Sequence, residues 1–262
     1  AMSSGVEDES IPGTPTKEPA FGIDAKWISA AHRERAELAG YTVVDAPTVL
    51  ATHLAEVIKK HAWEILSRQD VKALIDHVKE KAPAVVDELI PDLLTVGQVQ
   101  KVLENLLRER VSIKDMATIL EALADHAAST KDIDRLTEHV RQALARQIVQ
   151  PLLGPDKVLH VLTLDPQLEQ QILDSIQPSE FGTYLALDPR LLQQFIDNLA
   201  KEAEKMMLKG YTPVLVCAPV VRINIKRATE RQLPHLVVLS YNELVRGVNV
   251  QALGMVVGSH AS

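Results

Sequence analysis

The nine histidines are the side chains of this sequence best suited to hold a metal ion. His53 and His61 fall in one expected helix, but they lie eight residues apart, whereas zinc sites prefer closely spaced ligands. No cysteine or second histidine lies at ligand spacing from the others. We therefore expect no metal centre. The histidines beside charged residues on expected helix surfaces are interpreted as solvated or capping residues: His32, His77, His126 and His139.

The sole cysteine, Cys217, is the second candidate for chemistry. It ends the apolar run Val214–Cys217, and a cysteine in a buried strand normally behaves as a small hydrophobic residue. A nucleophile would need a base and an exposed, polarised position. His160 and His235 flank other expected strands and could approach Cys217, so a catalytic pair stays open as an alternative. A single cysteine excludes an intramolecular disulfide and fits a reducing compartment such as the cytoplasm.

Motifs for phosphate or cofactor binding are also missing. The segment Gly154–Lys157 lacks the further glycine and the Ser/Thr of a phosphate-binding loop, and no GxGxxG occurs. Glu202 and Glu204 lie among Lys201 and Lys205, a pattern typical of an exposed helix face. We expect no cofactor.

The composition is that of an ordinary globular protein of about two domains. Hydrophobic residues make up 46% of the 262 residues and charged residues 24%. No apolar run approaches the roughly 18 residues of a membrane helix. The net charge is −7 and the basic residues are scattered, which argues against nucleic-acid binding.

The aromatic residues give the first hint of a binding surface. Trp27 and Trp63 lie at helical spacing with aliphatic residues, which favours core packing. Phe21 follows Pro19 in a segment without periodicity. Such an aromatic can equally fill a seam between domains or form the floor of a recognition pocket, and both interpretations stay open.

The N-terminal part reads as a proline-rich arm over residues 1–20 and then a helix. Asp24 is a plausible N-cap, Trp27 and Leu38 lie on its apolar face, and Gly40 ends it. Tyr41–Val44 is expected to be a short strand. Asp45 then caps a helix with one apolar face, made of Leu50, Leu54, Val57, Ile58 and Ile65.

The middle of the chain is expected to be helical, with regular capping boxes. The pairs Ser67/Asp70, Thr95/Gln98 and Ser112/Asp115 each precede apolar residues at helical spacing. A longer helix is expected from Ile133 to Ile148. These helices indicate a compact helical domain.

The C-terminal part alternates strands with helices, which indicates a small, partly parallel sheet. The expected strands are Val158–Leu164, Pro213–Cys217, Leu236–Ser240 and Val248–Leu253. The fold class that we predict is α+β multidomain, with a mixed small α/β subdomain, a central helical subdomain and a C-terminal α/β subdomain.

Four long stretches carry a family resemblance. GTPTKEPAFGIDAKWI (residues 13–28), GYTVVDAPTVLATHL (40–54), LLRERVSIKDMATILEALADHA and LPHLVVLSYNEL closely resemble the cytoplasmic region of the FHIPEP family of type III export-gate proteins. The segment APTVLATHL resembles the flagellar branch of this family more than the related virulence-secretion gates.

This resemblance implies a non-enzymatic docking platform of the flagellar type III protein export gate. Proteins of the family carry an N-terminal membrane domain in the bacterial inner membrane, a linker and a cytoplasmic region of four subdomains that assembles into a nonameric ring. The ring receives flagellar export chaperone–substrate complexes and other export apparatus proteins. No nucleic acid is implied, and membrane attachment is implied only through the N-terminal domain.

The resemblance also implies subdomain boundaries. Residues 1–45 would be the second cytoplasmic subdomain, on the chaperone-cleft side; 46–65 the remaining helix of the first; 66–147 the helical subdomain; and 148–262 the C-terminal α/β subdomain. The membrane domain, the linker and the opening strands of the first subdomain would precede residue 1. The apolar face of the helix 46–65 would then lack part of its cover, which predicts reduced stability or a compensating contact between chains.

The resemblance further implies a chaperone-binding pocket in the cleft between the first two subdomains. Its residues map onto Glu18, Phe21, Val44, Val49 and Thr52. The apolar members would accept a chaperone helix and the polar ones would orient it. One buried aromatic anchor can dominate such an interface, so we expect Phe21→Ala to abolish binding and leave the fold intact.

Three other functions are kept as alternatives. A virulence-type export gate would share the architecture. A small-molecule enzyme would use the C-terminal α/β domain, with Cys217 or His160 in a deep polar cleft at strand ends, whereas a docking platform predicts an apolar groove near Phe21. A purely structural, ring-forming segment is compatible with the docking role.

Overall fold

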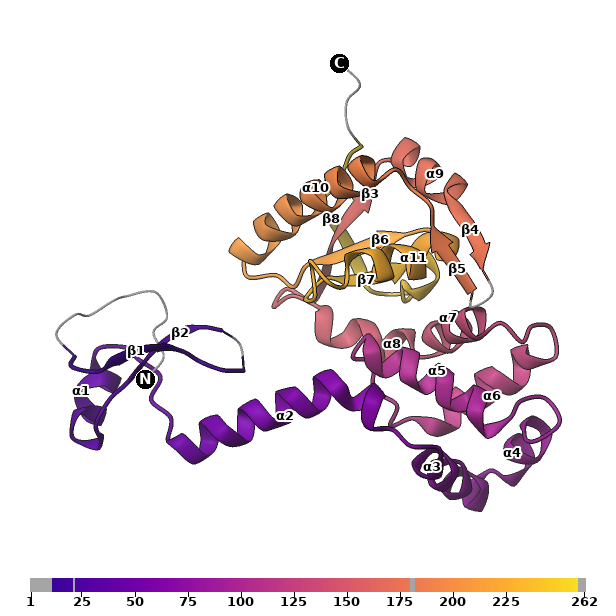
Figure 1. Ribbon diagram of the computed structural model, residues 1–262, viewed down its shortest axis with the longest axis horizontal. Coiled ribbons are helices and arrows are strands. Elements are labelled where there is room, and N and C mark those ends of the chain that lie inside the picture. The colour runs from indigo at the N-terminus through magenta and orange to yellow at the C-terminus, as the bar shows by residue number, and fades with distance from the viewer. Residues whose placement is uncertain (1–10, 21, 180–181, 259–262) are drawn as a thin grey trace. The chain divides into compact units, whose positions relative to one another are not determined.

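A computed structural model describes residues 11–20, 22–179 and 182–258 (Figure 1). The chain divides into two compact units, Ala1–Ile65 and Leu66–Ser262, and each is described by itself. Within the described ranges, no helix has both the length and the apolar character that a bilayer crossing requires.

The first unit contains a β-hairpin and two helices. Strands β1 (Thr14–Lys17) and β2 (Asp24–Trp27) pair antiparallel, with Thr14 opposite Trp27 and Lys17 opposite Asp24. A 3₁₀ turn (Ala30–His32) leads into α1 (Arg33–Leu38), and α2 (Ala46–Ile65) follows. The small core of the unit consists of Ile11, Ala36 and Tyr41, with Ile28, Ala39 and Val43 packed against it.

The prediction of a helix starting at Asp24 is wrong. Asp24–Trp27 is the second strand of the hairpin, and α1 begins only at Arg33. Pairing with β1 overrides the weak local helix signal, and an exposed ion pair of 2.8 Å joins Lys17 to Asp24 across the hairpin.

The strand predicted at Tyr41–Val44 is also wrong, since only Thr42 forms an isolated bridge. Tyr41 is instead buried in the small core. Its N–H donates to the Ala36 carbonyl (3.0 Å) and the Gly40 N–H donates to that of Glu37 (3.1 Å), while Gly40 adopts a φ of 84°. This is a Schellman ending of α1, with glycine at the position that needs a left-handed backbone.

Helix α2 begins where the sequence predicts, because Asp45 Oδ1 accepts a hydrogen bond from the Thr48 N–H (3.0 Å). None of its residues is buried. Leu50 is 67% exposed, and Leu54, Ile58 and Ile65 are exposed as well. The apolar face for which incomplete cover was expected therefore lies open in the part of the chain that the structure describes.

The second unit begins with a helical segment around one apolar core. Its helices are α3 (Arg68–Lys81), α4 (Pro83–Leu89), α5 (Val96–Arg108), α6 (Met116–Ala127), α7 (Ile133–Ala143) and α8 (Ala145–Val149). The fully buried centre of the core includes Leu103, Leu106, Ile119, Leu120 and Leu136.

The capping boxes are confirmed at Ser67/Asp70 and Thr95/Gln98, where each pair exchanges hydrogen bonds at the start of a helix. The third is wrong. Asp115 is itself the N-cap of α6, and its side chain accepts from the Thr118 N–H (3.2 Å). The long helix expected from Ile133 to Ile148 is divided at Leu144 into α7 and α8.

The rest of the unit is built on a four-stranded parallel sheet with strand order β7-β6-β3-β8. The strands are β3 (Val158–Leu164), β6 (Val214–Cys217), β7 (Val237–Ser240) and β8 (Asn249–Val256). The helices are α9 (Pro166–Asp174), α10 (Pro189–Leu208) and α11 (Pro219–Thr229). A short hairpin of β4 (Ile176–Ser179) and β5 (Gly182–Leu185) was not predicted from the sequence. The predicted fold class is confirmed.

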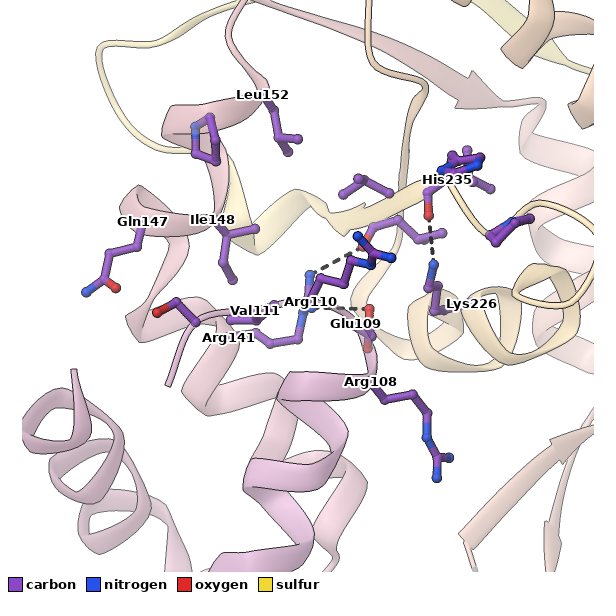
Figure 2. A pocket seen from close by; sticks show the side chains of 16 residues that line it. Arg108, Glu109, Arg110, Val111, Arg141, Gln147, Ile148, Leu152, Lys226 and His235 are labelled. Atoms are coloured by element: carbon purple, nitrogen blue, oxygen red, sulfur yellow. Dashed lines mark hydrogen bonds and ion pairs between the residues drawn. The ribbon is translucent and has the colours of Figure 1, made fainter. Parts of the chain in front are cut away.

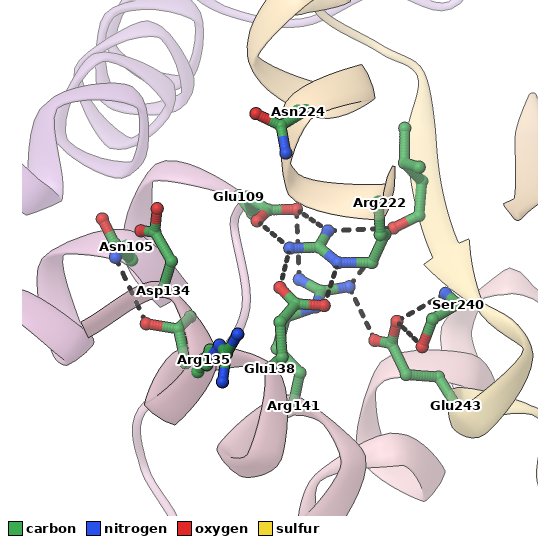
Figure 3. Close-up of polar contacts among 12 residues, drawn as sticks. Asn105, Glu109, Asp134, Arg135, Glu138, Arg141, Arg222, Asn224, Ser240 and Glu243 are labelled. Atoms are coloured by element: carbon green, nitrogen blue, oxygen red, sulfur yellow. Dashed lines mark hydrogen bonds and ion pairs between the residues drawn. The ribbon is translucent and has the colours of Figure 1, made fainter. Parts of the chain in front are cut away.

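A buried ion-pair network joins the helical segment to the sheet (Figure 3). It consists of Glu109, Glu138, Arg141, Arg222 and Glu243. Arg222 of α11 is fully buried. Its guanidinium donates to both oxygens of Glu109 (2.7 and 2.8 Å) and, from Nε, to Glu138 Oε2 (2.6 Å). Arg141 of α7 lies 3.2 Å from Glu109 and 2.7 Å from Glu243.

The network also holds the edge strand β7. The Val238 carbonyl accepts from Arg222 Nη1 (3.2 Å) and from Arg141 Nη2 (3.4 Å). Glu243 accepts from the Ser240 N–H (2.7 Å) at the end of the same strand. Buried charges are tolerated only when they are paired and hydrogen-bonded, so this arrangement requires that all its members be present together.

We expect Arg222→Ala to lower the free energy of unfolding of the second unit by about 3–5 kcal/mol, because it leaves the buried carboxylate of Glu109 and the partly buried one of Glu138 without their main partner. Urea unfolding measures this loss. Lys101→Ala is the matched control, since it removes an exposed pair with Glu104 (2.9 Å) and should cost about 1 kcal/mol or less. Equal losses in the two variants would contradict the importance of the network.

The network should also make stability depend on pH. Burial would raise the pKa of Glu109, but Arg141 and Arg222 together lower it from 4.5 to about 2. A carboxylate with a lowered pKa in the folded state contributes stability above its unfolded-state pKa, and this contribution is lost as the pH falls from 4.5 towards 2. Unfolding free energies at pH 5 and pH 3 should therefore differ more in the native chain than in Glu109→Gln, and identical differences would count against this origin.

Candidate functional site

The turn between β1 and β2 is built around Glu18, which is only 5% exposed. Its N–H donates to the Ile23 carbonyl (2.8 Å), and its own carbonyl accepts from the Gly22 N–H (2.8 Å). The carboxylate Oε2 accepts from the Ala20 N–H (2.9 Å). Gly22 permits the return of the chain with a φ of 71°. Glu18 thus organises the turn with its backbone and its side chain.

A small, mostly apolar hollow of about 30 Å³ lies beside this turn, within the first unit. It is lined by Thr16, Lys17, Glu18, Pro19, Ala25, Lys26, Trp27, Val44 and Val49. We call it the hairpin hollow. The start of α2 and the segment before it supply one wall, and the hairpin supplies the others.

The structure brings together three of the five residues assigned to the chaperone pocket. Glu18, Val44 and Val49 line the hairpin hollow. Thr52 does not line it, but it lies three residues after Val49 on α2 and so shares its helical face. Phe21 lies outside the described residues.

Trp27 is the residue that the sequence reasoning misplaced. Expected in a core, it is 49% exposed and lines the hairpin hollow. The error follows from the helix wrongly expected at Asp24, because a helical period places Trp27 with Ile28 and Leu38, whereas a strand turns alternate residues to opposite faces. The signal that could have placed Trp27 correctly is the ability of Thr14–Lys17 and Asp24–Trp27 to pair as two short strands.

The residues considered as candidates for catalysis, Cys217 and His160, both belong to the second unit. Cys217 is fully buried, its Sγ lies 3.7 Å from the Leu239 carbonyl, and burial raises the pKa of the thiol. The ring of His160 packs against Tyr211 at a centroid distance of 3.9 Å, and Nε2 lies 2.9 Å from Asp156 Oδ2. Cys217 therefore has neither the exposure nor the acidity of a nucleophile. Among the described side chains, no group of three or more potential ligands could hold a metal ion.

Known proteins are similar to this chain over almost its whole length. The model of the FHIPEP family matches residues 1–249. Flagellar biosynthesis protein FlhA of Bacillus subtilis (strain 168) is 48% identical over 256 residues, which are 98% of this chain and 38% of that protein. The chain therefore spans little more than a third of that relative.

Two solved structures share the fold. The Chlamydia pneumoniae CdsV protein superposes with a TM-score of 0.84 at 28% identity, over 97% of this chain and 74% of that one. Nonameric EPEC SctV-C superposes with a TM-score of 0.79 at 26% identity, over 97% of this chain and 77% of that one.

We expect Glu18→Ala to loosen the β1–β2 turn, because a hydrogen bond to a charged acceptor is worth about 1.5–3 kcal/mol. Hydrogen exchange at the Ala20 amide, followed by NMR, should become at least about tenfold faster, since 1.4 kcal/mol corresponds to that factor. Lys17→Ala, which removes only the exposed pair with Asp24, is the control. An unchanged exchange rate in Glu18→Ala would show that the carboxylate does not hold the turn.

Proposed function

This chain belongs to the FHIPEP family, and on that premise we propose that it is a docking platform of a flagellar type III protein export gate. In this role it binds export chaperones with their substrates and carries out no catalysis. The observation that supports the proposal most is the hairpin hollow, which combines apolar walls with one buried, hydrogen-bonded carboxylate. The identity of 48% with Bacillus subtilis FlhA favours the flagellar branch.

The hollow suits a helix that presents one or two apolar side chains. Trp27, Val44 and Val49 offer apolar surface. The family resemblance assigns Phe21 to the same binding site. Aromatic anchors typically dominate such interfaces, because they bury a large area at a small cost in conformational entropy. Glu18 and Thr52 would orient the bound helix through hydrogen bonds.

Self-association into a ring is the second part of the proposal. It is supported by the superposition on nonameric SctV-C and by the exposed apolar face of α2, which a neighbouring subunit could cover. We further propose the subdomain boundaries 1–45, 46–65, 66–147 and 148–262. The platform would lie on the cytoplasmic side of a bacterial inner membrane, attached through residues outside this chain.

The alternative of a small-molecule enzyme has little support. Its proposed nucleophile, Cys217, is buried, and burial raises the pKa of its thiol. Ligands of parallel α/β sheets bind outside the carboxyl ends of the strands. A hollow of about 370 Å³, by contrast, borders Pro234–Val238, where β7 begins.

Calorimetric titration with purified flagellar chaperone–substrate complexes tests the docking role. Phe21→Ala should abolish binding, and Trp27→Ala should weaken it about 30-fold, which corresponds to about 2 kcal/mol for an aromatic anchor. Leu38→Ala is the matched control, since Leu38 is an exposed apolar residue of the same unit that does not line the hollow. Unchanged affinity in both aromatic variants would refute docking at this site.

A further inference from the structure

Hollows of the second unit differ in whether their charged side chains already have partners. The hollow of about 370 Å³ lies beside the end of α5 and the start of β7 (Figure 2). Two of its cations are bound within the chain, since Arg141 Nη1 donates to Glu109 (3.2 Å) and Lys226 Nζ donates to the Leu236 carbonyl (2.7 Å). A ligand in this hollow would have to displace these partners.

A smaller hollow of about 140 Å³ is lined by α8 and by the turn that precedes β8. We call it the α8–β8 hollow. The polar side chains of its lining are those of Arg146, Arg246 and Gln150, so no carboxylate of the described residues in this lining balances the two positive charges. Its apolar lining consists of Val149, Val245 and Val248. Two arginines therefore border one small hollow, in a chain whose net charge is −7.

The guanidinium groups of Arg146 and Arg246 have no ion-pair or hydrogen-bond partner among the residues that the structure describes. Other arginines of the same unit are paired: Arg222 lies 2.7 Å from Glu109 and Arg227 lies 2.6 Å from Asp134. Two like charges at one hollow repel each other, and an anion placed between them would relieve this repulsion. The α8–β8 hollow is therefore suited to bind an anion.

The backbone on the β8 side of the hollow is a closed turn. The Val248 N–H donates to the Val245 carbonyl (3.2 Å), and Gly247 adopts a φ of 87°, as at the third position of a type II turn. Arg246 occupies the second position of this turn. Because the turn fixes the backbone of Arg246, the binding of a ligand costs less conformational entropy there than in an open loop.

The charge and the size of the hollow favour a phosphate group. Each guanidinium can donate two parallel N–H groups to oxygens, and a phosphate monoester offers three acceptor oxygens and a charge of about −2 near neutral pH. A single carboxylate would leave one of the two arginine charges unbalanced. Sites for drug-sized ligands span roughly 300–1,000 Å³. A hollow of about 140 Å³ is below that range and suits one small charged group.

We propose that the α8–β8 hollow binds a phosphate dianion, either as the free ion or as the monoester group of a small molecule. Arg146 and Arg246 pair with its oxygens, and the three valines of the lining restrict access of water, which strengthens both ion pairs. The bound anion links α8 of the helical segment to the turn that starts β8 of the sheet. This site is independent of the hairpin hollow, which lies in the first unit.

NMR titration of the intact chain at constant ionic strength tests the proposal with inorganic phosphate, glycerol phosphate and, as a control with a single charge, dimethyl phosphate. Inorganic phosphate or glycerol phosphate should shift the amides of Val149, Gly247 and Val248, with half-saturation near about 1 mM, and dimethyl phosphate should bind at least about tenfold more weakly. Binding of inorganic phosphate shows that the free ion suffices, whereas binding of glycerol phosphate alone identifies a monoester. No saturation by either dianion, or equal binding of dimethyl phosphate, would overturn the proposal.

Arg146→Gln and Arg246→Gln are the decisive variants, because each removes one guanidinium from an exposed position where it has no partner among the described residues. Arg231→Gln is the matched control, since Arg231 is equally exposed and does not line the hollow, and the net charge changes by the same amount. All three variants should unfold at the temperature of the native chain. Only the two hollow variants should bind the dianion at least about tenfold more weakly, since each loses a charge-assisted contact. Equal affinities in all three variants would show that the attraction is not specific to this hollow and would refute the assignment.

Discussion

The second unit depends on a pair of arginines buried between its two parts. Arg222 comes from the helical cover of the sheet and Arg141 from α7, and both converge on Glu109 at the end of α5. Each ion would be costly to bury alone, so the fold is stable only when the helical segment and the sheet deliver their charges together. Arg141 and Arg222 also donate hydrogen bonds to the Val238 carbonyl of the edge strand β7. These bonds help to protect that edge from pairing with another chain.

Local signals in the sequence predicted the second unit well. Capping boxes at Ser67 and Thr95 act within four residues, and the apolar strand Val158–Leu164 has few ways to be buried outside a parallel sheet. The ion-pair network could not be predicted, because its partners are up to 113 residues apart in the chain. Nothing in the local sequence of Arg222 distinguishes it from an exposed arginine of an amphipathic helix.

The first unit shows why the candidate site was predicted only in part. Its hairpin has four-residue strands, and DAKW carries no clear strand pattern, so a helix was expected where pairing with TPTK decides the structure. Family resemblance identified Glu18, Val44 and Val49, which the structure places around one hollow. It did not identify Trp27, whose position follows only once β2 is recognised as a strand. Side-chain placement at this site is therefore a consequence of the long-range pairing.

The central claim is that the hairpin hollow receives export chaperones. Methyl NMR of the intact chain, labelled at Val and Leu and titrated with a flagellar chaperone–substrate complex, tests it most directly, since Val44 and Val49 report on the hollow itself. The account predicts that the signals of these two valines broaden or shift, while those of Val161 and Val216 in the sheet of the second unit do not. Binding without any change at Val44 and Val49 would contradict it.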